Sequence, residues 1–391
     1  MATLSALAGL SLILWLYLWL GRGGYWRIGH RLPAAPAADR WPALAVVVPA
    51  RNEAAILPQT LPALLGQDYP GVFHVWLVDD HSEDGTGGIA RQIAGSLKAA
   101  DRLTVLAAAP LPAGWTGKLW ALEQGRRASE AAAPEFLLFT DADIAYPPGK
   151  LRDLVAEARR EALDLVSLMV RLHVRTFWER LLIPPFIYFF AMLYPFAWVG
   201  SSNRRTAAAA GGCLLLRRQA LAAAGGLPAI AGELIDDCAL ARRLKRHGRP
   251  GGGRIWLGLA ERAVSVRPYV GLADIWNMVV RTAFVQLRFS RLLLAATTTA
   301  MLLVFAVPPA AAVAGLLTGR PWPAAIGLTA WLLMARTLLP LLREYRVAAW
   351  FAPLFPLAAL LYMAMTLDSA RRFRRGRGGL WKGRSFAPAP K

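Results

Sequence analysis

The chain has 391 residues, of which 56% are hydrophobic, and a formal net charge of +20 at pH 7. A wholly soluble protein is disfavoured, because the apolar residues are concentrated in blocks, as expected where lipid solvates part of a chain. A nucleic-acid-binding protein is disfavoured too, because Lys and Arg do not alternate with aromatic residues on any recognisable module, whereas an anionic membrane surface accounts for the charge. Only Cys213 and Cys238 are present, so the sequence has no disulfide framework or CxxC metal motif, which fits a reducing compartment.

The N-terminal segment is almost wholly apolar up to Leu20, with no positive charge before the apolar run. Three arginines follow it: Arg22, Arg27 and Arg31. A cleaved signal peptide has the reverse charge order, although the Ala-Pro-Ala sequence at residues 35–37 resembles a cleavage site. We therefore predict a retained transmembrane anchor over residues 1–21, with its C-terminal side in the cytoplasm.

After a Pro- and Ala-rich linker at residues 32–42, short apolar runs alternate with longer amphipathic stretches, which is typical of a parallel α/β sheet. Six runs are predicted to be strands: 44–48, 73–78, 102–107, 135–140, 164–170 and 211–216. Ligands of open α/β sheets bind at the carboxyl ends of the strands. Two of these ends carry paired carboxylates, Asp79 with Asp80 and Asp141 with Asp143. The sequence thus predicts a ligand site at this edge of the sheet.

Apolar segments return after Arg291, at residues 292–317, 323–342 and 347–367, each near the roughly 20 residues that cross a bilayer. We predict C-terminal membrane helices over residues 291–368 and a basic tail over residues 369–391. If all three segments cross, the tail lies outside, against the tendency of positive residues to stay in the cytoplasm. One segment is therefore expected to be re-entrant or interfacial, as three residues suggest: Arg336, Pro353 and Pro356.

A further apolar stretch, residues 181–199, has the length of a span but lies between the two halves of the carboxylate set. A single crossing would put Asp143 and Asp237 on opposite sides of the membrane. We expect an interfacial segment instead, with its helix broken at three prolines: Pro184, Pro185 and Pro195. A buried core helix is the alternative.

The motifs that carry chemistry are short. The sequence VVVPARNEA (46–54) is a buried strand followed by a polar turn, and LVDDHSEDGT (77–86) places two carboxylates before a helix start. Ser82, Asp84 and Thr86 are common N-cap types, which explains them but not the preceding acid pair. FTDADI (139–144) is an Asp-x-Asp motif after a strand, and its two carboxylates suit a hard divalent cation completed by phosphate and water.

A second acid pair, Asp236 and Asp237, starts an amphipathic helix that is expected to end at Gly248. Acids in a first turn are favoured by the helix dipole alone, so this pair admits a structural as well as a catalytic role. The basic residues of this helix are expected on a solvated or headgroup-facing surface: Arg242, Arg243, Lys245 and Arg246.

Over residues 42–290 these motifs resemble the family 2 glycosyltransferases, which have the A-type fold. The resemblance rests on DDHSEDGT (79–86) and DAD (141–143) at the right separation, followed in order by GGC (211–213) and the Asp236–Asp237 helix. TGKLWALEQG (116–125), RTAAAAGGC (205–213) and LIDDCALARRLKR (234–246) look closer still to the bacterial hopanoid-associated subfamily.

The resemblance implies a role for each matched position. Four residues would line the nucleotide site: Pro49, Ala50, Glu53 and Asp79. Asp80 would lie beside that site and Lys118 would approach the nucleotide. Asp141 and Asp143 would hold Mg²⁺ or Mn²⁺ on the diphosphate. Asp237 would be the general base, with Asp236 beside it.

The implied activity is inverting transfer of a sugar from a nucleotide sugar, UDP-linked by the family pattern, to a membrane lipid such as a hopanoid or polyisoprenoid. The expected location is the bacterial inner membrane, with the catalytic domain in the cytoplasm and no nucleic-acid partner. Three departures stand out: Arg51 replaces a common Tyr, Glu123 replaces a common Asn, and VQLRFS (285–290) only loosely matches the Gln-x-x-Arg-Trp motif of polymer synthases. The alternatives are a non-catalytic membrane scaffold with a degenerate nucleotide-sugar site and a basic membrane protein that binds acidic lipid without turnover.

Overall fold

A computed structural model describes residues 2–34 and 40–379. The chain divides into two compact units. Among the described residues, the sheet unit comprises Gly29–His173 and Trp198–Arg267, and the helical unit comprises residues 2–28, Val174–Ala197 and residues 268–379. The basic residues Lys382 and Arg384 of the predicted tail, and residues 35–39 of the predicted linker, lie outside the described residues.

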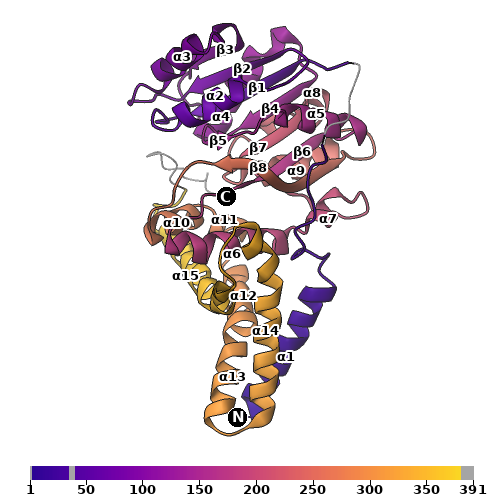
Figure 1. Ribbon diagram of the computed structural model, residues 1–391, viewed down its shortest axis with the longest axis vertical. Helices are drawn as coiled ribbons and strands as arrows, with labels where there is room; N and C mark the ends of the chain where they lie inside the picture. The colour runs from indigo at the N-terminus through magenta and orange to yellow at the C-terminus, as the bar shows by residue number, and fades with distance from the viewer. Residues whose placement is uncertain (1, 35–39, 380–391) are drawn as a thin grey trace. The chain divides into compact units, whose positions relative to one another are not determined.

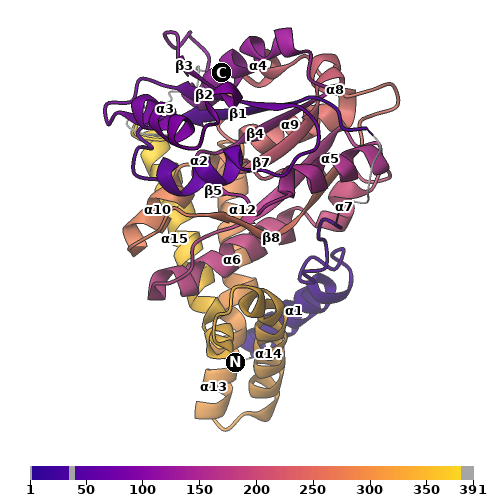
Figure 2. The same cartoon turned by 45° about the horizontal axis from the view of Figure 1, so that its top comes forward.

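The sheet unit contains one mixed, mostly parallel sheet in the order β3-β2-β1-β4-β7-β6-β8-β5 (Figures 1 and 2). Its strands are β1 (Leu44–Ala50), β2 (Phe73–Asp79), β3 (Leu103–Ala107), β4 (Phe136–Thr140), β5 (Ile144–Ala145), β6 (Leu165–Arg171), β7 (Cys213–Arg217) and β8 (Ile255–Ser265). All six predicted strands are present. The prediction of an α/β fold with a mostly parallel sheet is thus confirmed.

Two features of the sheet differ from the prediction. β7 runs antiparallel to both of its neighbours, β4 and β6. β8, parallel to β6, was not predicted at all. The reason lies in its sequence, because Glu261 and Arg262 interrupt the apolar run and both are exposed. The short β5 pairs antiparallel with the end of β8.

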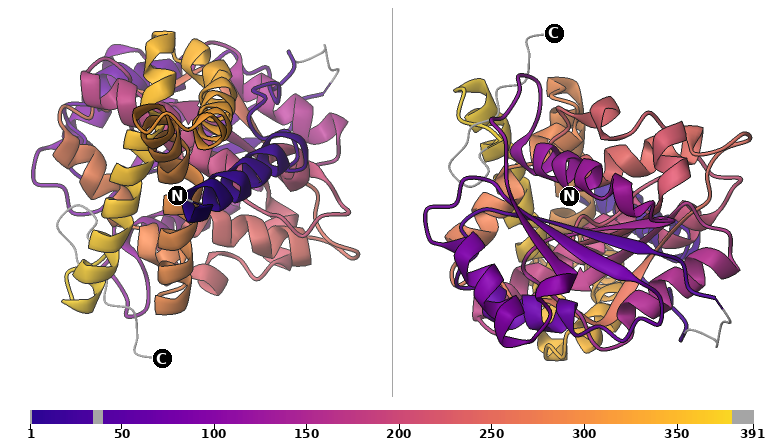
Figure 3. Two further views of the ribbon diagram at one scale, coloured as in Figure 1. Left: turned by 90° about the horizontal axis from the view of Figure 1, so that it is seen from below. Right: turned by 90° about the horizontal axis from the view of Figure 1, so that it is seen from above.

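Helices cover both faces of the sheet because successive side chains of a strand point to opposite sides. Val46 and Val48 belong to one apolar cluster with residues of α2 (Leu57–Leu65), α3 (Thr86–Ser96) and α5 (Lys150–Arg160). Val47 points the other way, toward α4 (Gly117–Ala128), and a Cβ on Gly125 would lie only 2.3 Å from its Cγ1. α8 (Arg218–Ala223) and α9 (Asp236–His247) pack against β7 and β8, respectively. Figure 3 shows the twisted sheet from above.

The helical unit contains α1 (Ala2–Leu20), α6 (Phe177–Leu193), α10 (Leu272–Val280), α11 (Ala283–Gln286), α12 (Arg291–Met301), α13 (Val307–Leu317), α14 (Pro321–Glu344) and α15 (Phe355–Arg374). A π-helical turn at Leu302–Ala306 joins α12 to α13, and a 3-10 helix at Ala349–Leu354 precedes α15. Five segments of the described chain are long and apolar enough to cross a membrane: Thr3–Leu20, Phe177–Gly200, Arg291–Leu317, Pro321–Glu344 and Ala349–Arg374. The predicted apolar helices at both ends of the chain are confirmed.

α1 packs against α13 and α14 (Figure 1). Trp15 of α1 donates a hydrogen bond from Nε1 to the carbonyl of Val304, 2.8 Å away, within the π-helical turn. Such a turn shifts the helical hydrogen-bond pattern, and side chains can satisfy the carbonyl groups that it releases. The indole edge also meets the ring of Phe305 at a centroid distance of 5.5 Å.

The expectation that Pro184 and Pro185 break the helix is wrong. α6 continues through both prolines, and only Pro195 lies at a break, between α6 and α7 (Phe196–Gly200). Proline removes an N–H donor and normally kinks a helix interior. Here both prolines are buried, and α6 packs against α14 and α15. The chain leaves the sheet unit after β6 and re-enters it before β7.

Candidate active site

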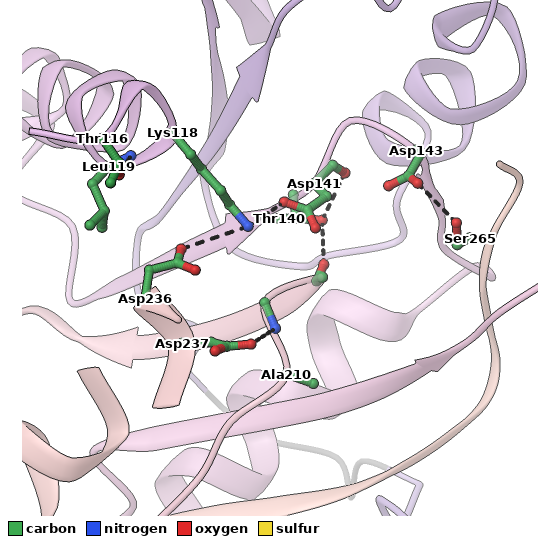
Figure 4. A network of polar contacts seen from close by, with 12 residues as sticks. Thr116, Lys118, Leu119, Thr140, Asp141, Asp143, Ala210, Asp236, Asp237 and Ser265 are labelled. Carbon is green, nitrogen blue, oxygen red and sulfur yellow. Dashed lines mark hydrogen bonds and ion pairs between the residues drawn. The ribbon is translucent and has the colours of Figure 1, made fainter. Parts of the chain in front are cut away.

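The topology gathers the predicted site residues at one edge of the sheet. β1, β2 and β4 are parallel neighbours, so their carboxyl ends lie together, and Ala50 pairs with Asp79 in register. Because β7 is antiparallel to β4, its beginning lies at the same edge, with Cys213 opposite Thr140. β8 ends there as well, where the N–H of Val266 donates to the carbonyl of Asp143. Figure 4 shows the resulting cluster of acids around Lys118.

The two loops that follow β1 and β2 are hydrogen-bonded to each other. The N–H of Asn52 donates to Ser82 Oγ at 3.0 Å, and the N–H of Glu53 donates to Thr86 Oγ1 at 2.9 Å. The N–H of Ala54 donates to Asp84 Oδ2 at 2.9 Å. Ser82 and Asp84 thus bind the neighbouring loop rather than only capping α3, whose N-cap is Gly85 without a side-chain cap bond. The loop after Pro49 and Ala50, which carries Glu53, is therefore held rigidly.

Asp79 and Asp80, the first acid pair, lie in different environments. Asp79 Oδ1 accepts from the N–H of Ser82 at 3.0 Å, and a Cβ on Gly87 would lie 2.8 Å from its Oδ2. Asp80 is buried, with Arg51 Nη1 at 3.7 Å from its Oδ2 and 2.7 Å from its carbonyl. Arg51, the residue that replaces a common Tyr, is thus a counterion for Asp80.

Lys118 joins the Asp-x-Asp motif to the second acid pair. It lies in the first turn of α4, which is capped by Thr116. Its Nζ is 2.7 Å from Asp141 Oδ1 and 3.7 Å from Asp236 Oδ2. Burial alone would lower the pKa of Lys118, but the surrounding carboxylates outweigh burial and raise it, so the side chain stays charged.

Asp143 faces away from Lys118 (Figure 4) and has different partners. Its Oδ2 accepts from Ser265 Oγ at 2.9 Å and lies 3.2 Å from Arg267 Nε. Arg267 Nη2 is in turn 2.8 and 2.6 Å from the two carboxylate oxygens of Glu53. Burial, together with the nearby Asp141, raises the pKa of Asp143, and Arg267 and Ser265 partly oppose that rise.

Ser265 and Arg267 were not predicted from the sequence because β8 was not predicted. A site residue at a strand end can be found only when its strand is recognised, and Glu261 and Arg262 interrupt the apolar run of β8 before its end. Gly211 was recognised only as part of a motif. In the structure its N–H donates to Asp237 Oδ2 at 2.8 Å.

Asp236 and Asp237 lie in the first turn of α9, as predicted, and the helix ends at His247, one residue before the predicted end at Gly248. Asp237 is partly exposed, and its Oδ1 accepts from the N–H of Cys238 at 2.7 Å. Burial and the adjacent Asp236 raise the pKa of Asp237 to about 6, while Lys118 and the two backbone donors act in the opposite direction. A carboxylate with such a pKa can accept a proton near neutral pH.

The expectation that Lys245 lies on a solvated face is wrong. Its Nζ donates to three carbonyls, those of Trp198 at 3.3 Å, Val199 at 2.6 Å and Thr206 at 2.7 Å. Burial lowers the pKa of Lys245. The lysine therefore fixes the segment before Gly211 to the same helix that carries Asp237.

The chemistry of the donor set fits a hard divalent cation. Asp141 and Asp143 offer carboxylate oxygens, and Mg²⁺ or Mn²⁺ commonly takes its remaining ligands from phosphate and water. Within residues 2–34 and 40–379, no group of three or more His, Cys, Asp or Glu side chains is arranged to hold a metal.

Comparisons with known proteins show the family and the fold of the chain. The family model described as "Glycosyltransferase like family 2" matches residues 42–251. The fold is similar to that of a mannosyltransferase, PcManGT from Pyrobaculum calidifontis, solved in complex with GDP-Man and Mn²⁺. That similarity has a TM-score of 0.56 at 22% identity and covers 94% of this chain and 98% of that one. S. aureus TarS 1-349 in complex with UDP-GlcNAc matches with a TM-score of 0.38 at 17% identity, over 86% of this chain and 92% of that one. No curated protein sequence matches the chain.

Proposed function

Because the chain belongs to the glycosyltransferase-like family 2, we propose that it transfers a sugar, with inversion, from a nucleotide sugar to a membrane lipid. The observation that carries this proposal is the arrangement around Lys118, which brings the Asp-x-Asp carboxylate Asp141 and the acid pair Asp236–Asp237 into one site. Groups at one edge of the sheet can thus bind the donor diphosphate and take the proton of the acceptor hydroxyl.

Asp237 is the proposed base. Backbone N–H groups of Gly211 and Cys238 orient its carboxylate, and its partial exposure gives an acceptor hydroxyl access. The carboxylate takes the hydroxyl proton while the acceptor oxygen bonds to the anomeric carbon and the bond from that carbon to the diphosphate oxygen breaks. Asp236 Oδ2 lies 3.7 Å from the ammonium group of Lys118, so we assign Asp236 to that ion pair and Asp237 to the base.

Asp141 and Asp143 are the proposed holders of Mg²⁺ or Mn²⁺. Such a cation, when bound, offsets the negative charge on the departing nucleoside diphosphate. Pro49, Ala50, Glu53 and Asp79 are proposed to line the nucleoside, with Asp80 behind them. A UDP-linked donor is proposed from the motif resemblance.

A donor screen tests the proposal. Purified protein in detergent is incubated with UDP-, GDP- and dTDP-linked sugars, Mn²⁺ and bacterial lipid extract that includes hopanoids and polyisoprenols. With one of the donors we expect release of nucleoside diphosphate and formation of a glycosylated lipid. A chelator should abolish both. A non-catalytic scaffold would release none with any donor, and that result would overturn the proposal.

Replacing Gly87 with Ala is expected to weaken nucleotide affinity about tenfold. The new Cβ would lie 2.8 Å from Asp79 Oδ2 and displace the carboxylate that we assign to the nucleoside site. Gly88→Ala is the matched control, because no atom lies within 4 Å of its Cβ position in the same helix. Equal nucleotide affinities of the two variants, measured by calorimetry, would contradict the assignment of Asp79 to the nucleoside site.

The acceptor is proposed to be a hopanoid or a polyisoprenoid in the bacterial inner membrane, with the catalytic unit in the cytoplasm. Five apolar segments support attachment to a membrane. Phe177–Gly200 begins after β6 and ends before β7, neighbouring strands of one sheet, so a single crossing by this segment would split the sheet. We therefore retain the proposal that it lies in the interface.

The end of α15 supports a cytoplasmic tail. Asp368 Oδ2 accepts from Trp276 Nε1 of α10 at 2.8 Å and from Arg372 Nε at 2.9 Å, and Arg372 Nη1 donates to Asn277 of α10 at 2.9 Å. α10 comes before the first C-terminal span in the chain, so it lies on the side of the catalytic unit. If α12–α13 and α14 cross as a pair and α15 does not cross, the arginines at the end of α15 stay in the cytoplasm, as the positive-inside tendency favours.

A fluorescent reporter fused after Lys391 is accordingly expected to fluoresce in the cytoplasm, whereas alkaline phosphatase at the same point is expected to be inactive. The control fusion ends at Gly319, in the turn between α13 and α14, and is expected to give the opposite pair of results. An active phosphatase after Lys391 would show that α15 crosses.

A further inference from the structure

Arg267 is the least expected member of the site. It follows β8, and its guanidinium contacts both a carboxylate of the Asp-x-Asp motif and a buried acid of the β1 loop. Together with Lys118, it gives each acid of the motif a positively charged partner from the chain itself. This inference rests on the function proposed above. We propose that the ion pair with Arg267 keeps Asp143 from binding a free metal ion, so that the divalent cation binds only together with the donor diphosphate.

The geometry of Arg267 shows how firmly Asp143 is held. Two oxygens of Glu53 bind the same nitrogen, Nη2, while Nε faces Asp143 Oδ2. Ser265 Oγ donates to that same Oδ2 atom. Glu53 is only 7% exposed and Asp143 15%, while Arg267 is 35% exposed, so water screens these pairs only in part. Charge-assisted bonds of this kind are stronger than neutral ones.

A free cation therefore meets two motif carboxylates that already have positively charged partners. Lys118 is paired with Asp141 and Arg267 with Asp143, and a divalent ion would have to displace or approach two positive groups. The described residues offer no alternative cluster of three metal-binding side chains. Binding of a cation alone is thus expected to be weak.

A nucleoside diphosphate changes this balance. Its phosphate oxygens can accept the hydrogen bonds of the guanidinium and ammonium groups, which releases the two carboxylates, and they also supply metal ligands. Arginine is well suited to this exchange because its planar group binds carboxylate and phosphate in the same forked geometry. Metal and nucleotide must then strengthen each other's binding by the same factor, as linkage requires.

A purely structural role of Arg267 would give a different result. If Arg267 only ties the β1 loop to the end of β8, its removal lowers the melting temperature and weakens metal binding. If it withholds Asp143, its removal strengthens the binding of free metal. The two roles thus differ in the sign of one measurable quantity.

The test is a Mn²⁺ titration of the full chain in detergent, followed by electron paramagnetic resonance of free Mn²⁺. For the wild type we expect GDP or UDP to increase Mn²⁺ affinity at least tenfold. Arg267→Met and Arg267→Gln are expected to bind Mn²⁺ without nucleotide about fivefold more tightly than the wild type, with a smaller gain on adding nucleotide. Arg217→Met is the matched control, because Arg217 pairs with Glu135 at 2.8 Å at the opposite end of β7 and β4. It should leave both affinities unchanged.

Two results would overturn the proposal. One is a wild type that binds Mn²⁺ equally well with and without GDP or UDP, a measurement that needs no variant. The other is unchanged or weaker binding of free Mn²⁺ by both Arg267 variants. Neither result affects the proposed transferase activity, which the donor screen tests separately. Failure of every nucleotide sugar in that screen would instead reject the function.

Discussion

Asp237→Asn is expected to slow sugar transfer at least about a hundredfold, the usual scale of general base catalysis, while nucleotide affinity changes less than about twofold. The amide keeps the shape of the side chain, and its single oxygen can still accept from one of the two N–H groups, of Gly211 or Cys238, that bind the two oxygens of Asp237. It cannot take a proton from the acceptor. Single-turnover transfer rates and calorimetric nucleotide affinities, measured on the same preparation, check both parts.

Asp236→Asn is the comparison for that variant, because Asp236 is the neighbouring acid and lies 3.7 Å from Lys118. We expect its loss to be the smaller of the two. Near-normal transfer by Asp237→Asn, together with a large loss in Asp236→Asn, would assign the base to Asp236.

The pH dependence follows from the raised pKa of Asp237. Because the base must be deprotonated, the rate should hold above a pH of about 6 and fall as the pH drops through that value. The residual rate of Asp237→Asn should lack this acidic limb. An acidic limb of the same midpoint in the variant would show that another group causes it.

Asp141→Asn is expected to lower the metal-dependent rate about a hundredfold at a fixed Mn²⁺ concentration, because the amide lacks the charge that holds a cation. It also removes the partner of Lys118 at 2.7 Å. Nucleotide-dependent Mn²⁺ binding should weaken in parallel, which can be measured without turnover. Asp143→Asn should act in the same direction.

Asp68→Asn is the control for the metal variants, since Asp68 is exposed and pairs with Arg152 at 2.9 Å outside the site. It should retain the wild-type rate. Full activity of Asp141→Asn and Asp143→Asn in chelator-treated buffer would contradict the metal assignment.

The structure adds to the sequence interpretation mainly by showing the ion-pair partners of residues that depart from the family pattern. Arg51, which departs from the common Tyr, neutralises Asp80, and Glu123, which departs from the common Asn, is buried and paired with Arg126 and Arg127 on α4. Both departures thus bring charge pairs of their own rather than unpaired charges. Such pairing depends on neighbours that are distant in the chain or on a shared helix face, and motif matching does not register it.

Local features were predictable from sequence where one run of residues determines them. The strands β1, β2 and β4 are continuous apolar runs, and the acids that follow them lie at the expected edge because parallel strands end together. The α9 helix with Asp236 and Asp237 in its first turn was predictable from its amphipathic period and Gly248. The apolar helices were predictable from length and hydropathy.

Other features were decided only by tertiary packing. The antiparallel direction of β7 depends on its neighbours β4 and β6, and it is this direction that brings Gly211 to Asp237. Arg267 reaches Glu53 across 214 positions of sequence, and Lys245 is a half-buried donor because three carbonyls converge on it. Pro184 and Pro185 remain helical within a packed helix. In each case the deciding energy comes from contacts between segments far apart in the chain, which local propensity does not contain.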